Sequence, residues 1–291
     1  MNGNDLRLQN EHLASNTGDD RLYHFGLGKQ TTDLKQFSDV KFVCTGGAGH
    51  RIQIYAELFS KETGVAASGN LSNSDRYVLY KTGPILWANH GIGTPSLSVM
   101  LNEILKLLAY AGASDVSFFR LGTSGGIGVA PGTVVISNGA MNGELTDKYV
   151  MYIQGKRVSR KPTHLDEGIR EALKASAVKL SIPYAEGKTL CADDFYEGQM
   201  RLDGFFCNYG ADEKFAFLHR LNELGVRNIE MESTCFSATT LRAGVKAAIC
   251  CVTLLNRMDG DQVNITAEQY MEYEMRPFRV VVAYIRSLLN I

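Results

Sequence analysis

The sequence predicts an α/β protein with a central, largely buried sheet. Short apolar runs alternate with helical patterns along most of the chain, as they do in α/β domains. The 29 glycines concentrate where the apolar runs end, and the ends of strands are where open α/β sheets bind ligands. Because no proline-rich or low-complexity linker interrupts the pattern, we expect one domain over residues 21–291. Residues 1–20 are polar and are expected to form a flexible tail.

The elements follow in order along the chain. The expected strands are the apolar runs at 40–47, 76–93, 116–128, 132–140, 226–232 and 245–255. The expected helices are the segments at 52–62, 96–111, 165–179 and 213–224, one beginning at Ser233, and one at 268–289.

Composition excludes several classes of function. The chain has 30 basic and 31 acidic residues, so no overall field favours nucleic acid or an anionic membrane. The longest apolar runs fall short of the roughly 20 residues that cross a bilayer. The six cysteines show no C-x-x-C pairing and mostly lie in apolar runs. They are expected to be reduced core thiols in a cytoplasmic protein.

Two glycine-rich runs follow apolar strands. The first, CTGGAGHR, places Gly47 before a predicted helix that Arg51 opens, so bare amides there can approach an anion. A turn that needs glycine is the structural alternative. The second, FFRLGTSGGIG, combines the charge of Arg120 with the hydroxyls of Thr123 and Ser124. Arg120 is interpreted as an anion ligand, the alternative being a buried ion pair with Asp or Glu.

Two carboxylates flank Met231 in the run NIEMES. Glu230 and Glu232 are expected on one face of a strand, where they suit the vicinal hydroxyls of a sugar. They also fit a glycosidase acid/base pair. A third interpretation is that they are carboxylates favoured by the dipole of the helix from Ser233.

The run FYEGQMRLDG places an amide beside a guanidinium. In an extended segment Gln199 and Arg201 would point the same way, and together they would read an acceptor, donor, acceptor edge such as that of uracil. A solvated turn is the plainer alternative. None of the six histidines shows metal-ligand spacing, and no nucleophile motif is present, so neither a metal nor covalent catalysis is expected.

Together these motifs resemble the nucleoside phosphorylase-I family, and within it the animal-type uridine phosphorylases. The resemblance runs in order from about residue 22 to the C-terminus, through HFGLG, KFVCTGG, DRYVLYKTGP, RLGTSGGIG, DFYEGQMRLDG, RNIEMES and CVTLLNRMDGDQ. It implies a single three-layer α/β/α domain around a mixed, partly barrel-like sheet. The implied reaction is reversible phosphorolysis of uridine, and of deoxyuridine or thymidine, to the base and α-ribose 1-phosphate in pyrimidine salvage.

The resemblance also implies roles for individual residues. The phosphate-binding residues would be Gly47, Arg51, Arg120 and Thr123, with Arg76 contributed by a neighbouring subunit. The ribose-binding residues would be Met231 and Glu232, with His24 reaching across from the neighbour. The uracil-binding residues would be Ser124, Gly125, Phe195, Gln199 and Arg201. The expected assembly is a homodimer with shared sites, and no cofactor is expected beside the co-substrate phosphate.

The chain departs from relatives of other specificity at two places. Purine-cleaving members carry an aspartate where this chain has Asn256 and Arg257, which disfavours purines. Bacterial members carry a cation-binding glutamate where Tyr77 follows Arg76, so neither that cation nor their hexamer is expected. A nucleosidase and a non-catalytic paralogue are the alternatives. We expect Arg120→Ala to lower phosphorolysis severely while leaving the fold intact, since the proposed partner of Arg120 is phosphate and not an internal carboxylate.

Overall fold

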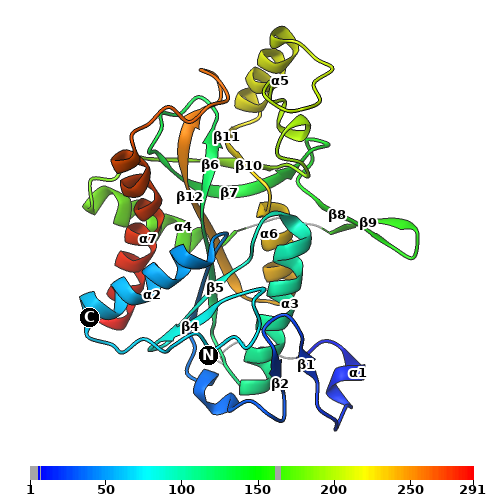
Figure 1. Ribbon diagram of the computed structural model, residues 1–291, viewed down its shortest axis with the longest axis vertical. Coiled ribbons are helices and arrows are strands. Elements are labelled where there is room, and N and C mark those ends of the chain that lie inside the picture. Colours follow the sequence, from blue (N-terminus) through cyan, green and yellow to red (C-terminus); the bar gives the residue numbers. More distant parts are fainter. Residues whose placement is uncertain (1–5, 7, 161–164) are drawn as a thin grey trace. The chain divides into compact units, whose positions relative to one another are not determined.

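The computed structural model describes residues 6, 8–160 and 165–291 (Figure 1). They form two compact units. The N-terminal unit comprises the described residues up to Phe119 with Arg242–Lys246, and the C-terminal unit comprises Arg120–Leu241 and Ala247–Ile291. The predicted tail at 1–20 lies partly outside the described residues, and its described part contains the short helix α1 (Glu11–Ala14). The single domain over 21–291 stays a prediction.

The N-terminal unit contains a small mixed arrangement of strands. Strand β5 (Ile85–Asn89) pairs in parallel with β3 (Phe42–Gly46) and antiparallel with β4 (Leu79–Thr82). The other elements are the hairpin β1 (Arg21–Leu22) and β2 (Leu27–Gly28), the 3-10 turn η1 (Leu34–Phe37), and the helices α2 (Gly49–Thr63) and α3 (Gly93–Ala111).

Helix α2 buries one face because its apolar residues recur every three to four positions. Tyr55 and Phe59 are four residues apart, so they lie on one face, and both rings pack on the fully buried Trp87 of β5. The helix ends at Gly64, whose φ of 74° is left-handed and suits glycine. Because α2 begins shortly after β3 ends, the first glycine-rich run lies at the junction of these two elements.

The C-terminal unit is built on a closed five-strand sheet. Its strands are β6 (Ser117–Gly126), β7 (Val134–Asn142), β10 (Tyr184–Cys191), β11 (Val226–Glu230) and β12 (Lys246–Asn256). They run in the order β11-β10-β7-β12-β6, and β11 pairs again with β6 to close the ring. Strand β10 pairs in parallel with β7 and β11, whereas β12 is antiparallel to β7. The predicted α/β class and mixed, partly barrel-like sheet are confirmed.

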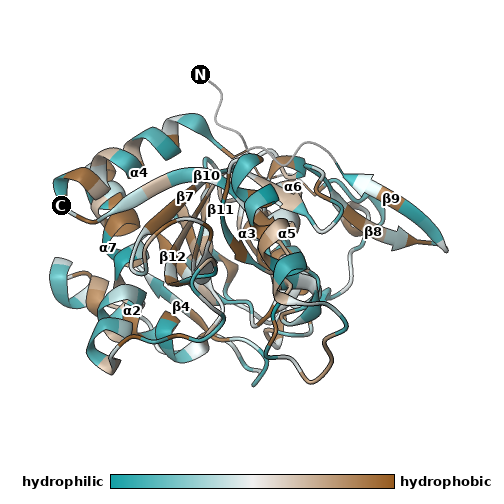
Figure 2. Ribbon diagram, turned by 90° about the horizontal axis from the view of Figure 1, so that it is seen from above, coloured by the Kyte–Doolittle hydropathy of each residue, from teal (hydrophilic) through white to brown (hydrophobic). Residues whose placement is uncertain are grey.

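Helices surround these strands. They are α4 (Glu167–Lys179), α5 (Ala211–Glu223), α6 (Ser233–Arg242) and α7 (Ala267–Leu289), with a 3-10 turn η2 (Glu197–Gln199). Helices α4 and α7 pack side by side. The hairpin β8 (Tyr149–Ile153) and β9 (Lys156–Arg160) extends away from the five-strand sheet (Figure 2). In the part of the chain that the structure describes, no helix has the length and hydropathy to cross a membrane.

Strand β10 was not predicted from the sequence. Its middle residues Glu186, Gly187 and Lys188 interrupt the apolar pattern on which strand prediction relies. In the structure Glu186 forms ion pairs with Arg170 and with Lys174, the latter at 2.9 Å, both from α4. The charged residue is therefore accommodated by its ion pairs with α4, a contact that the local sequence of β10 does not reveal.

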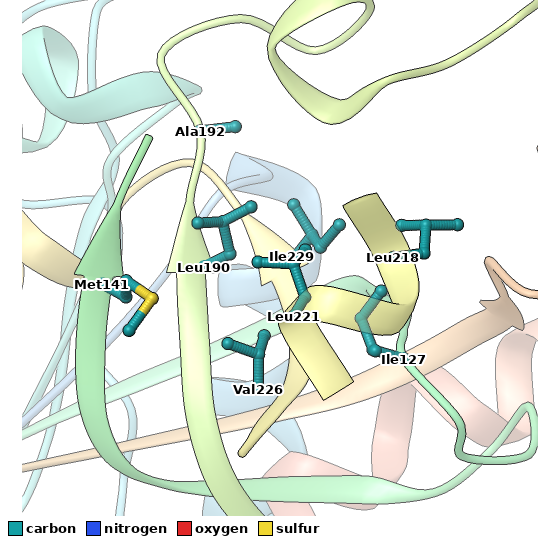
Figure 3. Close-up of a cluster of buried hydrophobic side chains, with 8 residues drawn as sticks. All are labelled: Ile127, Met141, Leu190, Ala192, Leu218, Leu221, Val226 and Ile229. Carbon is teal, nitrogen blue, oxygen red and sulfur yellow. The ribbon is translucent and has the colours of Figure 1, made fainter. Parts of the chain in front are cut away.

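A buried apolar cluster joins α5 to the ends of β10 and β11 (Figure 3). Leu190 of β10 and Ile229 of β11 pack together with Leu218 and Leu221 of α5. Burying such side chains stabilises the fold by about 1.5 to 3 kcal/mol each. The cluster anchors both strand ends, from which the segments carrying Gln199 and Glu232 depart.

Candidate functional site

Arg120 lies at the centre of a buried charged group in the C-terminal unit. It is 3% exposed, and its Nη2 is 2.7 Å from Glu230 Oε2 and also contacts Glu232. Its Nη1 donates to Cys251 Sγ at 2.7 Å. Two carboxylates therefore converge on one guanidinium.

The prediction that Arg120 has no internal carboxylate partner is wrong. Closure of the barrel is the reason, because Ile229 of β11 pairs with Gly125 of β6 and brings Glu230 beside the arginine. Glu232 lies just beyond the end of β11 and not on the strand as expected. Among the described residues Arg120 Nε has no hydrogen-bond partner, although it is buried. The Nε–H of the guanidinium is thus an unused donor. The carboxylates of Glu230 and Glu232 offset much of the free-energy cost of burying the charge of Arg120.

Burial raises the pKa of Glu230, and the negative charge of Glu232 raises it further. The positive charge of Arg120 lowers this pKa but does not cancel the increase. The raised pKa favours the neutral acid and so reduces the charge imbalance of two carboxylates facing one guanidinium. Met231, between the two glutamates, is half-buried.

The remaining candidate residues on β6 are Thr123, Ser124 and Gly125. Thr123 is half-buried, and Ser124 Oγ donates to the Val252 carbonyl at 3.1 Å. A Cβ on Gly125 would lie 3.0 Å from Cγ of Arg257, so a larger residue would require that side chain to shift. The glycine-rich run therefore makes room for a second buried arginine.

Gln199 and Arg201 do not lie on an extended segment, so that prediction is wrong. Gln199 ends η2, and Met200 follows with a left-handed φ of 53°. The chain turns because the Asp194 carboxylate accepts the amides of Tyr196 at 2.7 Å and Gly198 at 3.1 Å. The side chains are nevertheless buried, at 4% and 8% exposure, so they do not decorate a solvated turn.

Arg201 is fixed by three neighbours. Its Nε and Nη2 donate to the two carboxylate oxygens of Asp203 at 2.8 and 2.6 Å. Nη2 also donates to the Asp261 carbonyl at 2.8 Å, and the ring of Phe195 lies 4.6 Å from the guanidinium carbon. Arg201 Nη1 forms no hydrogen bond with any described residue. This nitrogen can therefore donate to a ligand.

Asp261 connects this segment to two buried cations. Its carboxylate accepts Nε of Arg257 at 3.0 Å, the Leu202 amide at 2.9 Å, and lies 2.9 Å from Lys214 Nζ. Arg257 in turn donates to the Gln199 carbonyl at 2.8 Å. Burial alone would raise the pKa of Asp261, but the Leu202 amide, Lys214 and Arg257 lower it.

These residues place a surplus of positive charge near Gln199. Among the described residues, Arg201, Arg257 and Lys214 form ion pairs with two carboxylates, those of Asp203 and Asp261. Such a site favours a ligand that carries acceptor atoms or gains negative charge. In the sequence Arg257 follows an apolar run, as Arg120 does, so the same argument would have found it. Lys214 gives no such signal, since nothing local distinguishes it from an exposed helical lysine.

Asp261→Asn is expected to destabilise the protein by about 3 kcal/mol at neutral pH, because it leaves Lys214 and Arg257 buried without their counter-charge. The lowered pKa means that Asp261 stabilises the fold above its unfolded pKa and loses this effect as pH falls through the folded pKa. The difference from wild type in urea unfolding should therefore shrink below about pH 4.

The matched control for this measurement is Asp147→Asn. Asp147 pairs with Lys188 at 3.1 Å, but its side chain is 54% exposed, so the loss should stay below about 1 kcal/mol. Equal losses in the two variants would contradict a central role for Asp261.

The N-terminal unit holds the other four predicted residues. His24 lies in the turn between β1 and β2, and its Nδ1 is 2.7 Å from Glu103 Oε1. Arg76 is exposed, and the segment before it is tied to the same turn because the Asn73 amide donates to the Phe25 carbonyl at 2.8 Å. A backbone hydrogen bond thus joins the segments that carry His24 and Arg76.

Gly47 and Arg51 lie at the beginning of α2. Gly47 is half-buried, and a Cβ there would lie 3.1 Å from the Gly91 carbonyl oxygen. The N-cap residue Ala48 supplies no side-chain hydrogen bond, and the 8% exposed Arg51 lies in the first turn. Uncapped amides with an adjacent arginine form a place where an anion is stabilised.

Comparison with known proteins agrees with these features. The model of the phosphorylase superfamily matches residues 41–286. The chain is 60% identical to the uridine and thymidine phosphorylase of Caenorhabditis elegans, over 100% of this chain and 98% of that protein. It is 39% identical to the inactive uridine phosphorylase B of Schistosoma mansoni, over 96% of this chain and 95% of that protein.

A solved structure is similarly close. Uridine phosphorylase from Schistosoma mansoni in complex with thymidine is 41% identical and superposes with a TM-score of 0.93, over 98% of this chain and 99% of that chain. The chain therefore belongs to the phosphorylase superfamily, and its resemblance to the animal-type uridine phosphorylases is confirmed.

Proposed function

We propose that this protein is a uridine phosphorylase, a pentosyltransferase that reversibly converts uridine and phosphate to uracil and α-ribose 1-phosphate. The observation that carries the proposal is the burial of both Gln199 and Arg201, with Arg257 hydrogen-bonded to Gln199. Relatives named for uridine and thymidine support the same substrates, and we include thymidine and deoxyuridine.

The proposed roles divide among three subsites. Gly47, Arg51, Arg120 and Thr123 would bind phosphate, and Met231 and Glu232 would bind ribose. The base would meet Ser124, Gly125, Phe195, Gln199 and Arg201. Glu232 already contacts Arg120, so it would link the ribose hydroxyls to the phosphate subsite.

The charges of the site suit this reaction. As the bond between sugar and base stretches, positive charge grows on the ribose and negative charge on uracil. The surplus cations around Gln199 then bind the transition state more strongly than the substrate, which is what accelerates a step. Phosphate acts directly on the sugar, so inversion without a covalent enzyme intermediate is expected.

Phosphate dependence tests the proposal. Uracil release from uridine should require inorganic phosphate and should yield α-ribose 1-phosphate, measured by chromatography and phosphorus NMR. Equal release without phosphate would indicate a nucleosidase. Because one relative is named inactive, a non-catalytic protein is the second candidate, and the absence of turnover under both conditions would favour it.

We further propose a cytoplasmic homodimer in which Arg76 and His24 complete the neighbour's site, with no cofactor beside phosphate. Inactive Arg76→Ala and Gln199→Ala chains should then rescue each other. A mixed dimer would have one doubly damaged and one intact site, so random mixing should restore roughly a quarter of wild-type activity. A purified heterodimer without recovered activity would contradict site sharing.

A further inference from the structure

Glu103 is a buried carboxylate in the middle of the largely apolar helix α3. It is 7% exposed and is the only acidic residue among Gly93–Ala111. A carboxylate in such a place is costly unless several donors satisfy it. A specific arrangement of donors therefore has to account for its presence.

Among the residues that the structure describes, the donors to this carboxylate come from the turn that carries His24. Oε2 accepts the amides of His24 at 3.0 Å and Phe25 at 3.1 Å. Oε1 lies 2.7 Å from His24 Nδ1. The carboxylate thus holds both the backbone of the turn and the imidazole ring.

A second group confines the imidazole. The ring of Tyr77 lies 6.3 Å from that of His24, and the hydroxyl of Tyr77 donates to the Ser96 carbonyl of α3 at 2.9 Å. Tyr77 is 3% exposed, so it is not free to move aside. The His24 side chain, in contrast, is 44% exposed, which leaves its far edge accessible.

We propose that Glu103 is a positioning residue. It orients the imidazole ring of His24 and holds the ring proton on Nδ1, so that the ring can bind the ribose 5'-hydroxyl. Because a carboxylate accepts at Nδ1, the proton lies on Nδ1, and Nε2 of the neutral ring is an acceptor for that hydroxyl. This inference rests on the proposed function and on the ribose role of His24 within it.

A purely structural role for Glu103 makes a different prediction. If the carboxylate only holds the turn through the two backbone amides, its loss harms every substrate alike. If it acts through the imidazole, its loss matters only for a substrate that has a 5'-hydroxyl. 5'-Deoxyuridine lacks only that group and therefore separates the two roles.

The experiment compares wild type, Glu103→Gln, His24→Ala and the double variant on uridine and on 5'-deoxyuridine. Glu103→Gln is expected to lower kcat/KM for uridine by about tenfold or more, the effect of losing one charge-assisted hydrogen bond. The change for 5'-deoxyuridine should stay within about twofold, and the double variant should be no worse on uridine than His24→Ala. Asn102→Asp, an exposed change of similar size on the same helix, should match wild type.

Equal losses on both substrates, or losses that multiply in the double variant, would overturn the proposal. Wild-type turnover of uridine is measured first, so failure of the proposed function is seen separately. If Glu103→Gln does not fold, the imidazole nitrogen NMR spectrum of intact wild type decides, with the His24 signals assigned from His24→Ala. A proton on Nδ1 supports the proposal, and a neutral ring protonated on Nε2 contradicts it.

Discussion

Cytidine is expected to be cleaved about 10⁴-fold less efficiently than uridine, measured as kcat/KM for phosphorolysis. Its amino group would face the donor-only guanidinium of Arg201, and its unprotonated ring nitrogen would not donate to Gln199. Arg201 cannot turn away, because Asp203, the Asp261 carbonyl and the ring of Phe195 hold it. Buried donors would then be left unpaired, which is the mismatch that discriminates most strongly.

Thymidine and deoxyuridine are the controls for this measurement. Both bases keep the acceptor, donor, acceptor edge of uracil, so both should be cleaved, less well than uridine. Inosine should fail because this chain has Arg257 near the base subsite. Cytidine turnover within tenfold of uridine would contradict the assignment of Gln199 and Arg201.

Arg120→Met is expected to lower phosphorolysis by at least about 10²-fold, since each charge-assisted hydrogen bond that Arg120 is proposed to make to phosphate is worth about 1.5 to 3 kcal/mol. The structure adds a second effect, because Glu230 and Glu232 would be left buried without their cation. Removing one member of such a buried group costs about 3 to 5 kcal/mol, so urea unfolding should show a large loss of stability.

Arg120→Lys separates the two effects. A lysine keeps the positive charge beside the carboxylates but lacks the planar fork, so stability should be largely kept while KM for phosphate rises about tenfold or more. Arg220→Lys is the matched control, because Arg220 is 59% exposed in a surface pair with Glu223. Near wild-type KM for phosphate in Arg120→Lys would show that Arg120 serves the fold and not the substrate.

The sequence by itself determined the α/β class and most of the regular elements. Apolar runs and helical spacing are local properties, so the strand from Phe42 and the helix from Ser233 could be read directly from them. The same holds for the glycine-rich runs and for the pairing of Gln199 with Arg201 as candidate base contacts. Their order along the chain was enough to indicate the family.

Only the tertiary structure decided how the charges are paired. Arg120 and Glu232 are 112 positions apart, and they meet because β11 closes the barrel against β6. The pairing of Asp261 with Lys214 likewise joins distant segments, and so does that of Glu103 with His24, 79 positions apart. Local patterns report propensity and burial, whereas the partner of a buried charge is set by contacts between distant segments, which form only when the chain folds.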